Sequence, residues 1–143
     1  MHATAVLLGD SGVLITGRPG SGKTTLALSL IDYFRRSGRF SQLICDDQVL
    51  LSAQSGRVVC RAPQSIAGLV EIRGLGPRPL EHEAAMVADL LVRLIPTGSA
   101  ERFPDERSES LAGCHIPCLE LAEACVETAT FAVASWLALP PFR

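Results

Sequence analysis

The sequence contains almost no lysine. Its 143 residues include twelve arginines but a single lysine, Lys23. Aromatic residues are also scarce, at 5%, whereas hydrophobic residues as a class make up 48%. We therefore expect a single domain over residues 1–143, with a core of Leu, Val, Ile and Ala. The use of arginine at every other basic position raises the question of what Lys23 does that an arginine could not.

The chain also lacks a strong charge of either sign and a long apolar run. Its formal net charge is -2 at pH 7, which argues against a general nucleic-acid or membrane-surface binder. No apolar run reaches the ~18 residues of a membrane-spanning helix. The N-terminus lacks the basic and apolar regions of a signal peptide. We therefore expect a cytoplasmic protein with neither nucleic acid nor membrane as a partner.

The five cysteines do not have the arrangement of a disulfide framework, because their number is odd and their spacing irregular. Cys114, His115 and Cys118 suggest half of a zinc site, but no second pair follows at a usual spacing. We favour the alternative that these cysteines are small, buried hydrophobic residues.

Short apolar segments and turn residues predict strands along much of the chain. The segment 101–109 is charged and is expected to form a loop. The predicted strands cover residues 4–8, 13–16, 42–45 and 115–121, and a hairpin covers 49–61.

Helices are predicted over residues 23–36 and 122–139, the second ended by Pro140 and Pro141. The segment 83–94 is ambiguous, because its Ala and Leu content favours a helix while its last residues suit a strand. We expect it to begin as a helix and to end as a strand. Strands mixed with helices around a glycine-rich loop indicate an α/β domain.

That loop, GRPGSGKTT, matches the phosphate-binding pattern G-x-x-x-x-G-K-[ST]. Its glycines let backbone N–H groups approach phosphate oxygens, and the helix after it presents its N-terminus to the same anion. Lys23 is predicted to reach the β- and γ-phosphates, and the Thr24 hydroxyl to hold Mg²⁺. The alternative is a glycine-rich turn leading into a structural helix. The predicted nucleotide-binding residues are Gly17, Arg18, Pro19, Gly20, Ser21, Gly22, Lys23, Thr24 and Thr25.

This motif offers an explanation for the single lysine. A compact ammonium on a flexible stem fits inside a cradle of backbone groups, whereas the planar guanidinium of an arginine is too wide. We therefore predict that Lys23 is kept because it is a phosphate ligand.

Two later segments have residues that suit phosphoryl transfer. Asp46 and Asp47 follow a predicted strand and can hold Mg²⁺ or orient a nucleophile, although Asp is also common in turns and caps. In VEIRGLG, residues 70–76, Glu71 and Arg73 share a strand face. By composition alone this segment would be an ordinary strand and turn.

The segments GVLITGRPGSGKT, CDD and VEIRGLG together resemble the HPr kinase/phosphorylase family of the bacterial phosphotransferase system. The third is very similar to the family signature Leu-Glu-Ile-Arg-Gly-Leu-Gly. His2 stands where the family has a histidine before the phosphate loop, although by itself it would pass for a disordered residue after the first methionine. The resemblance is firm up to Gly76. It implies a PEP-carboxykinase-like, phosphate-loop nucleotide-binding domain with a central mixed sheet, in a short form similar to the family's catalytic domain.

The same resemblance implies an activity. The family uses ATP to phosphorylate a serine hydroxyl on the carrier protein HPr, and it reverses the modification with inorganic phosphate, releasing pyrophosphate. An HPr-type phosphocarrier is therefore the expected partner, ATP and Mg²⁺ are the expected cofactors, and a homo-oligomer is implied. The residues alone also leave open a small-molecule kinase and a nucleotide-sensing binding module without turnover.

Roles for individual residues follow from the resemblance. Asp46 would take the proton of the serine hydroxyl, and His2 would support the Asp46 carboxylate. Arg73 would organise the floor of the active site. The expected catalytic residues are Asp46, His2, Lys23 and Arg73, and the expected metal-binding residues are Thr24, Asp47 and Glu71.

Overall fold

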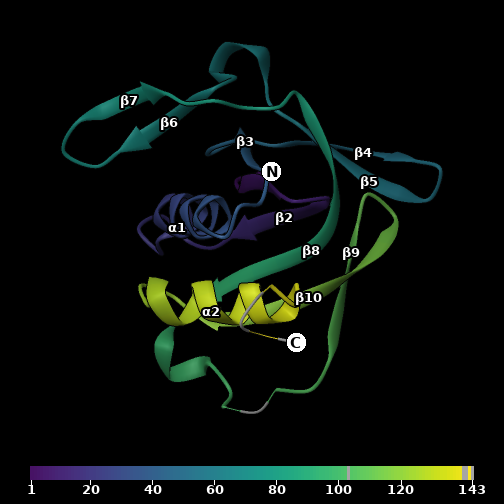
Figure 1. Cartoon of the computed structure of the whole chain (residues 1–143). Helices are drawn as coiled ribbons and strands as arrows, with labels where there is room; N and C mark the ends of the chain where they lie inside the picture. The colour runs from purple at the N-terminus through teal and green to yellow at the C-terminus, as the bar shows by residue number, and fades with distance from the viewer. Residues whose placement is uncertain (103, 140–141, 143) are drawn as a thin grey trace.

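A mixed sheet forms the centre of the protein (Figure 1). The structure, a computed structural model, describes residues 1–102, 104–139 and 142. Within these residues the sheet has eight strands. They are β1 (Thr4–Leu8), β2 (Ser11–Thr16), β3 (Ser41–Cys45), β4 (Leu50–Gln54), β5 (Arg57–Arg61), β8 (Ala85–Ile95), β9 (Arg107–Leu111) and β10 (Cys114–Ala122).

The strand order is β3-β1-β2-β8-β10-β9, and the β4–β5 hairpin joins the sheet where β5 pairs with β8. β8 runs parallel to both β2 and β10, whereas the other pairs are antiparallel. β2 thus lies inside the sheet, so the loop that follows it leaves from a rigid position. The elements outside this sheet are the hairpin of β6 (Leu69–Ile72) and β7 (Gly76–Pro79), the helices α1 (Lys23–Arg36) and α2 (Val126–Trp136), and the short 3-10 helices Gln64–Ile66 and Thr97–Ser99.

Two apolar layers enclose the central strands. α1 and α2 pack side by side on one face of the sheet (Figure 1), where the Ser29 and Thr130 hydroxyls are 2.8 Å apart. Successive residues of β2 alternate between the layers: Val13 and Ile15 belong to the helix side and Leu14 to the opposite side, which also contains residues of β3 and β5. This alternation is the period of two of an extended strand.

The expectation of a helix at the start of residues 83–94 is wrong, because β8 is extended over Ala85–Ile95. The strand has partners along both edges and is buried on both faces. Leu90 and Val92 pack toward the helices, while Leu91 packs on the opposite side. Residues 90–92 are thus apolar on both faces, so this run carries no strand period to distinguish it from a buried helix.

Other boundaries also differ from the prediction. The expected helix over 122–139 covers only Val126–Trp136, because β10 continues to Ala122. Its expected stop, Pro140 and Pro141, lies outside the described residues. The charged loop expected over 101–109 ends earlier, since β9 begins at Arg107 and pairs with β10. The strand over 4–8, the helix over 23–36 and the hairpin within 49–61 are confirmed.

The described cysteines are all free. Cys45, Cys60 and Cys118 are buried as expected, whereas Cys114 is half-buried and Cys125 is exposed. Burial raises the pKa of the Cys45 thiol to about 12 and that of the Cys60 thiol to about 11. Three of the cysteines therefore behave as small hydrophobic residues.

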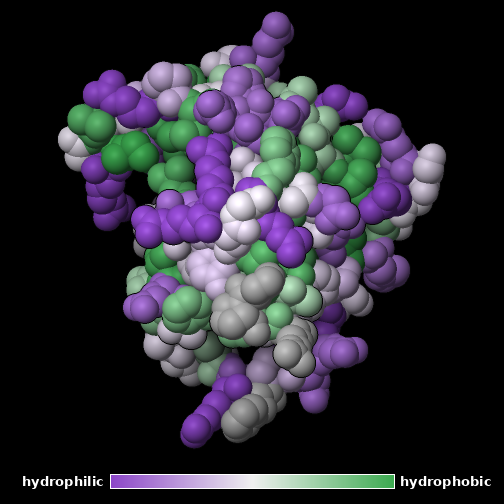
Figure 2. All heavy atoms as spheres, viewed as in Figure 1, coloured by the Kyte–Doolittle hydropathy of each residue, from purple (hydrophilic) through white to green (hydrophobic). Residues whose placement is uncertain are grey.

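The exposed surface carries apolar side chains at two hairpins. Figure 2 shows green patches over the β6–β7 hairpin and over the β4–β5 hairpin, separated by hydrophilic side chains. The exposed leucines at these places are Leu69 and Leu75 in the first hairpin and Leu50 in the second. Among the helices of the described residues, none is long and apolar enough to cross a membrane.

Candidate phosphate-transfer site

The phosphate loop connects the inner strand β2 to the first turn of α1. Gly22 is the N-cap of α1 and has φ 100°, a conformation that a residue with a side chain rarely adopts. No side chain caps this helix, and no acidic residue lies in its first turn. The N–H groups at the start of α1 are therefore left to an external anion.

Lys23 folds back across the loop. Its Nζ donates hydrogen bonds to the carbonyl oxygens of Gly17 at 2.9 Å and Arg18 at 3.3 Å. An ammonium has three donors, so Lys23 can hold the loop and still offer a donor to a phosphate oxygen. The lysine thus lies inside the backbone cradle, where the sequence predicted it.

Position 17 needs a glycine because the backbone there packs closely against Ser21 and Leu94. A Cβ at this position would lie 2.5 Å from Ser21 Oγ and 3.1 Å from Leu94 Cβ. Leu94 belongs to β8, so the rear of the phosphate loop rests directly on the neighbouring strand. Any side chain at Gly17 would push the loop away from this support.

Asp46 lies at the end of β3 and is only 6% exposed. Its Oδ1 accepts hydrogen bonds from Thr4 Oγ1 at 2.8 Å and Thr24 Oγ1 at 2.9 Å, and its Oδ2 accepts one from the Glu71 N–H at 3.2 Å. These donors come from β1, α1 and β6, three elements that are distant in sequence. Such hydrogen bonds offset the free-energy cost of burying a carboxylate, and they fix its orientation.

The predicted segments converge on one cleft of about 770 Å³. Arg73 follows β6 and reaches across to the phosphate loop, where its Nη2 is 4.0 Å from the place that a Cβ on Gly20 would take. Two cations, Lys23 and Arg73, therefore contribute to the same cleft. It is lined by Pro19, Gly20, Gly22, Lys23, Thr24, Thr25, Asp46, Asp47, Glu71, Ile72, Arg73, Gly74, Leu75 and Gly76.

His2 lies beside this cleft and does not line it. It forms a β-bridge with Gln48, and its Nδ1 is 3.0 Å from the Gln48 side-chain amide nitrogen. Thr4, two positions further along the chain, donates its hydroxyl to Asp46 as Thr24 does.

Thr4 is a site residue that the sequence reasoning missed. Its one signal is a polar side chain in a strand that is otherwise apolar, TAVLL. The Arg18 side chain points away from the cleft and forms a bidentate ion pair with Glu123. Its carbonyl oxygen accepts a hydrogen bond from Lys23 Nζ.

The donors in the cleft fit a magnesium ion bound together with phosphates. Thr24, Asp47 and Glu71 all line this space, and Mg²⁺ prefers oxygen ligands such as their side chains carry. Within the described residues no group of three or more His, Cys, Asp or Glu side chains could hold a metal by itself.

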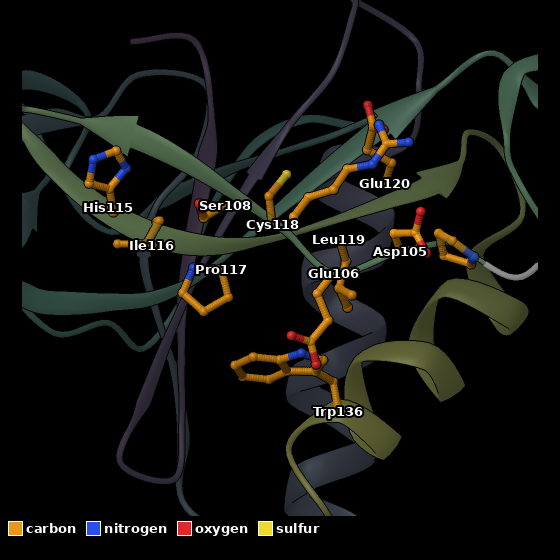
Figure 3. A pocket seen from close by; sticks show the side chains of 12 residues that line it. Asp105, Glu106, Ser108, His115, Ile116, Pro117, Cys118, Leu119, Glu120 and Trp136 are labelled. Atoms are coloured by element: carbon orange, nitrogen blue, oxygen red, sulfur yellow. The ribbon is translucent and has the colours of Figure 1, made fainter.

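A second cavity, of about 630 Å³, lies between β10 and the C-terminal end of α2. Figure 3 shows the Trp136 indole beside Glu106, with Pro117 and His115 further along β10. None of the predicted site residues lines this cavity. The chemistry therefore points to the phosphate-loop cleft.

Comparison with known proteins identifies a family for the first half of the chain. Residues 1–78 match the family model described as HPr Serine kinase C-terminal domain. The HPr kinase/phosphorylase of Clostridium beijerinckii is 37% identical over 76 residues, which are 53% of this chain and 23% of that protein. That of Mycoplasma mycoides is 35% identical over 75 residues, 52% of this chain and 22% of that protein. The chain thus matches less than a quarter of the length of these curated relatives.

A solved structure resembles nearly the whole chain. The HPr(Ser) kinase/phosphatase from Coxiella burnetii matches with a TM-score of 0.80 and 23% identity, covering 96% of this chain and 87% of that one. The likeness confirms the expected fold, a phosphate-loop α/β domain of the PEP-carboxykinase type with a central mixed sheet. Because the family model spans more than half of the chain and includes every predicted site residue, the protein belongs to the HPr Serine kinase C-terminal domain family.

Proposed function

We propose that the protein is an ATP-dependent serine kinase that phosphorylates an HPr-type phosphocarrier of the bacterial phosphotransferase system. We propose that the same site also runs the reverse reaction with inorganic phosphate. The observation that supports this most strongly is the position of Asp46. Its carboxylate is hydrogen-bonded to Thr24 of the phosphate-loop helix and to the backbone of Glu71, within the cleft that contains Lys23 and Arg73.

The nucleotide is bound through its phosphates. Backbone N–H groups of the phosphate loop and the N-terminus of α1 face the β- and γ-phosphates, and Lys23 adds a positive charge. Bound Mg²⁺ would neutralise charge on the phosphate oxygens, and Thr24, Asp47 and Glu71 are the residues that would hold it. Arg73 stabilises negative charge from the opposite wall of the cleft.

The transfer step needs a base and an aligned nucleophile. Asp46 accepts the proton of the serine hydroxyl while the serine oxygen forms a bond to the γ-phosphorus, and the bond from that phosphorus to the bridging oxygen of ADP breaks. In the reverse direction, an oxygen of inorganic phosphate attacks the phosphoserine phosphorus. Asp46 then returns the proton to the serine oxygen, and pyrophosphate leaves. His2 lies beside Gln48, outside the cleft, and is proposed to support the Asp46 carboxylate from there.

A protein acceptor suits the surface next to the cleft better than a small molecule does. Leu75 lines the cleft and is 59% exposed at the turn of the β6–β7 hairpin, and Leu69 of the same hairpin is 37% exposed. An apolar patch beside a charged cleft is typical of a contact surface for another protein. We further propose a cytoplasmic location, neither nucleic acid nor membrane as a partner, and a homo-oligomer in solution.

The decisive experiment is transfer to the carrier. The full chain is incubated with ATP, Mg²⁺ and purified HPr-type carrier, and the carrier mass is followed. We expect the addition of one phosphoryl group, located on a serine by peptide fragmentation, and its removal when phosphate replaces ATP. Nucleotide hydrolysis or metabolite phosphorylation without transfer would favour a small-molecule kinase. Nucleotide binding without turnover would favour a sensing module.

A further inference from the structure

Arg18 and Glu123 join the phosphate loop to the junction between β10 and α2. Arg18 Nε donates to Glu123 Oε2 at 3.0 Å, and its Nη2 donates to the other carboxylate oxygen. The two residues are 105 positions apart in the sequence. The Glu123 side chain is only 12% exposed despite its charge, whereas Arg18 is 67% exposed. A guanidinium and a carboxylate in this two-bond arrangement hold each other in a defined orientation.

The backbone around Glu123 contacts the loop as well. The Ala124 N–H donates to the carbonyl oxygen of Ser21 at 3.0 Å, and a Cβ on Gly22 would lie 3.9 Å from Ala124 N and from Val126 Cγ2. The Glu123 N–H donates to Ile95 O of β8 at 2.8 Å. The junction is thus fixed to the central sheet and supports the outer side of the phosphate loop.

From this arrangement we infer that Glu123 is a positioning residue for phosphate binding: it holds Arg18, and with it the outer side of the phosphate loop, in the shape that receives the anion. The inference rests on the proposed function, since it assigns a task within the same site. Neither residue lines the cleft, so Glu123 acts through the loop and does not touch the phosphates.

The ion pair between Arg18 and Glu123 becomes more important for the shape of the loop when phosphate is present. In the structure Lys23 holds the Gly17 and Arg18 carbonyl oxygens. A lysine that shares its three donors with phosphate oxygens holds these carbonyls less firmly. Arg18 then keeps two constraints that do not depend on Lys23: the Ser21 N–H, which donates to its carbonyl at 3.0 Å, and the Glu123 carboxylate. A loop that is already in its binding shape loses less entropy on binding.

The test compares Glu123→Gln with the wild-type full chain and with Glu127→Gln, which removes an exposed carboxylate four residues away in the first turn of α2. The probes are inorganic pyrophosphate and ATP, each with Mg²⁺, titrated by calorimetry. We expect Glu123→Gln to weaken both probes by the same factor, about three- to tenfold. Glu127→Gln should leave both affinities unchanged. Because the Arg18 partner is 67% exposed, the unfolding midpoint of Glu123→Gln should shift by less than about 2 °C.

A double-mutant cycle separates positioning from general structural damage. If the two side chains act through their mutual bond, Arg18→Gln should weaken pyrophosphate binding as Glu123→Gln does, and the double variant should lose no more than either single one. The exchanged pair, Arg18→Glu with Glu123→Arg, should recover most of the affinity. In transfer assays Glu123→Gln should raise the KM for ATP and leave kcat unchanged.

Several results would overturn the inference. Unchanged pyrophosphate affinity in Glu123→Gln would show that the bond does not position the loop. Tighter binding would show that the carboxylate only repels phosphate and withholds Arg18 from it. Losses that add up in the double variant would show two independent effects. If the wild-type chain binds neither probe, the proposed function fails as well, and that outcome is distinct from the others.

Discussion

Lys23 lies against backbone groups of the phosphate loop. Its Nζ is held by two carbonyl oxygens of the loop that precedes it. A guanidinium is planar and presents its donors in a fixed fork, so it cannot turn within the same space. Arg18 on the outer side of the loop and Arg73 across the cleft lie where a wider group can be accommodated.

Lys23→Arg should therefore weaken nucleotide binding although the charge is kept. We expect ATP affinity to fall by more than about tenfold, because the guanidinium displaces the loop that should hold the phosphates. Calorimetric titration of ATP measures the loss. The control is Arg39→Lys, the reverse exchange at an exposed position, which should bind ATP as the wild type does. Wild-type affinity in Lys23→Arg would contradict the explanation of the single lysine.

The variant Asp46→Asn tests whether Asp46 is the base that takes the serine proton. The amide keeps the size of the carboxylate but cannot take a proton, so transfer to the carrier should fall by about 10²- to 10⁴-fold. The affinity for ATP should change little, because the phosphates are held by the loop. Initial rates of carrier phosphorylation and a separate ATP titration provide the two measurements.

Asp10→Asn, in the exposed turn between β1 and β2, is the matched control and should be fully active. An Asp46→Asn enzyme that transfers phosphate at the wild-type rate would remove Asp46 from the role of base.

At the scale of elements, the helix after the phosphate-loop motif was easier to predict from the sequence than the strands around it. The phosphate-loop motif and the helix after it were predicted with correct bounds, because glycine spacing and one apolar stripe are local features. β8 was identified only at its end, since residues 90–92 are apolar and buried in succession and show no alternation. The contact between Thr4 and Asp46 was also missed, because it depends on the pairing of β1 with β3 and not on a motif.

Gly17→Ala tests the support of the loop by β8. A Cβ would meet Ser21 Oγ at 2.5 Å and Leu94 Cβ at 3.1 Å, so the Ser21 hydroxyl must rotate and the loop or the strand must yield slightly. We expect weaker binding of pyrophosphate and ATP, together with a loss of stability of about 1–3 kcal/mol. Binding is measured by calorimetry, and stability by urea unfolding.

Gly98→Ala is a matched control, because no atom lies within 4 Å of a Cβ at that position. Equal behaviour of the two variants would show that the close approach at Gly17 is unimportant.

At the scale of the whole molecule, the two apolar layers determine which thiols can react. Cys45 and Cys60 belong to the layer opposite the helices and have no exposed surface, whereas Cys125 is exposed. Because burial disfavours the thiolate, the pKa of Cys45 is about 12 and that of Cys60 about 11, above the ordinary value of 9.0.

Iodoacetamide at pH 8 should therefore modify Cys125 and leave Cys45 and Cys60 unmodified until the protein is unfolded in denaturant. Mass spectrometry of proteolytic peptides provides the measurement. The raised pKa values also predict a pH dependence of stability. The unfolded chain releases these protons near pH 9 and the folded chain only above it, so the stabilisation is complete below pH 9 and is lost between about pH 9 and pH 12.

Rapid labelling of Cys45 or Cys60 in the folded protein would contradict the arrangement of the two layers. So would a free energy of unfolding, measured by urea titration, that is constant between pH 8 and pH 10.

The support of Gly17 by β8 has a consequence for folding kinetics. The phosphate-loop motif is complete in the chain by Thr24, yet the atoms behind it arrive much later: Leu94 faces Gly17, and Ala124 holds the Ser21 carbonyl. The parallel pairing of β2 with β8 must also wait for residues 88–93. Contacts of such long sequence separation form slowly. During synthesis on the ribosome, the N-terminal 78 residues would therefore display all the family's motifs before a phosphate site exists.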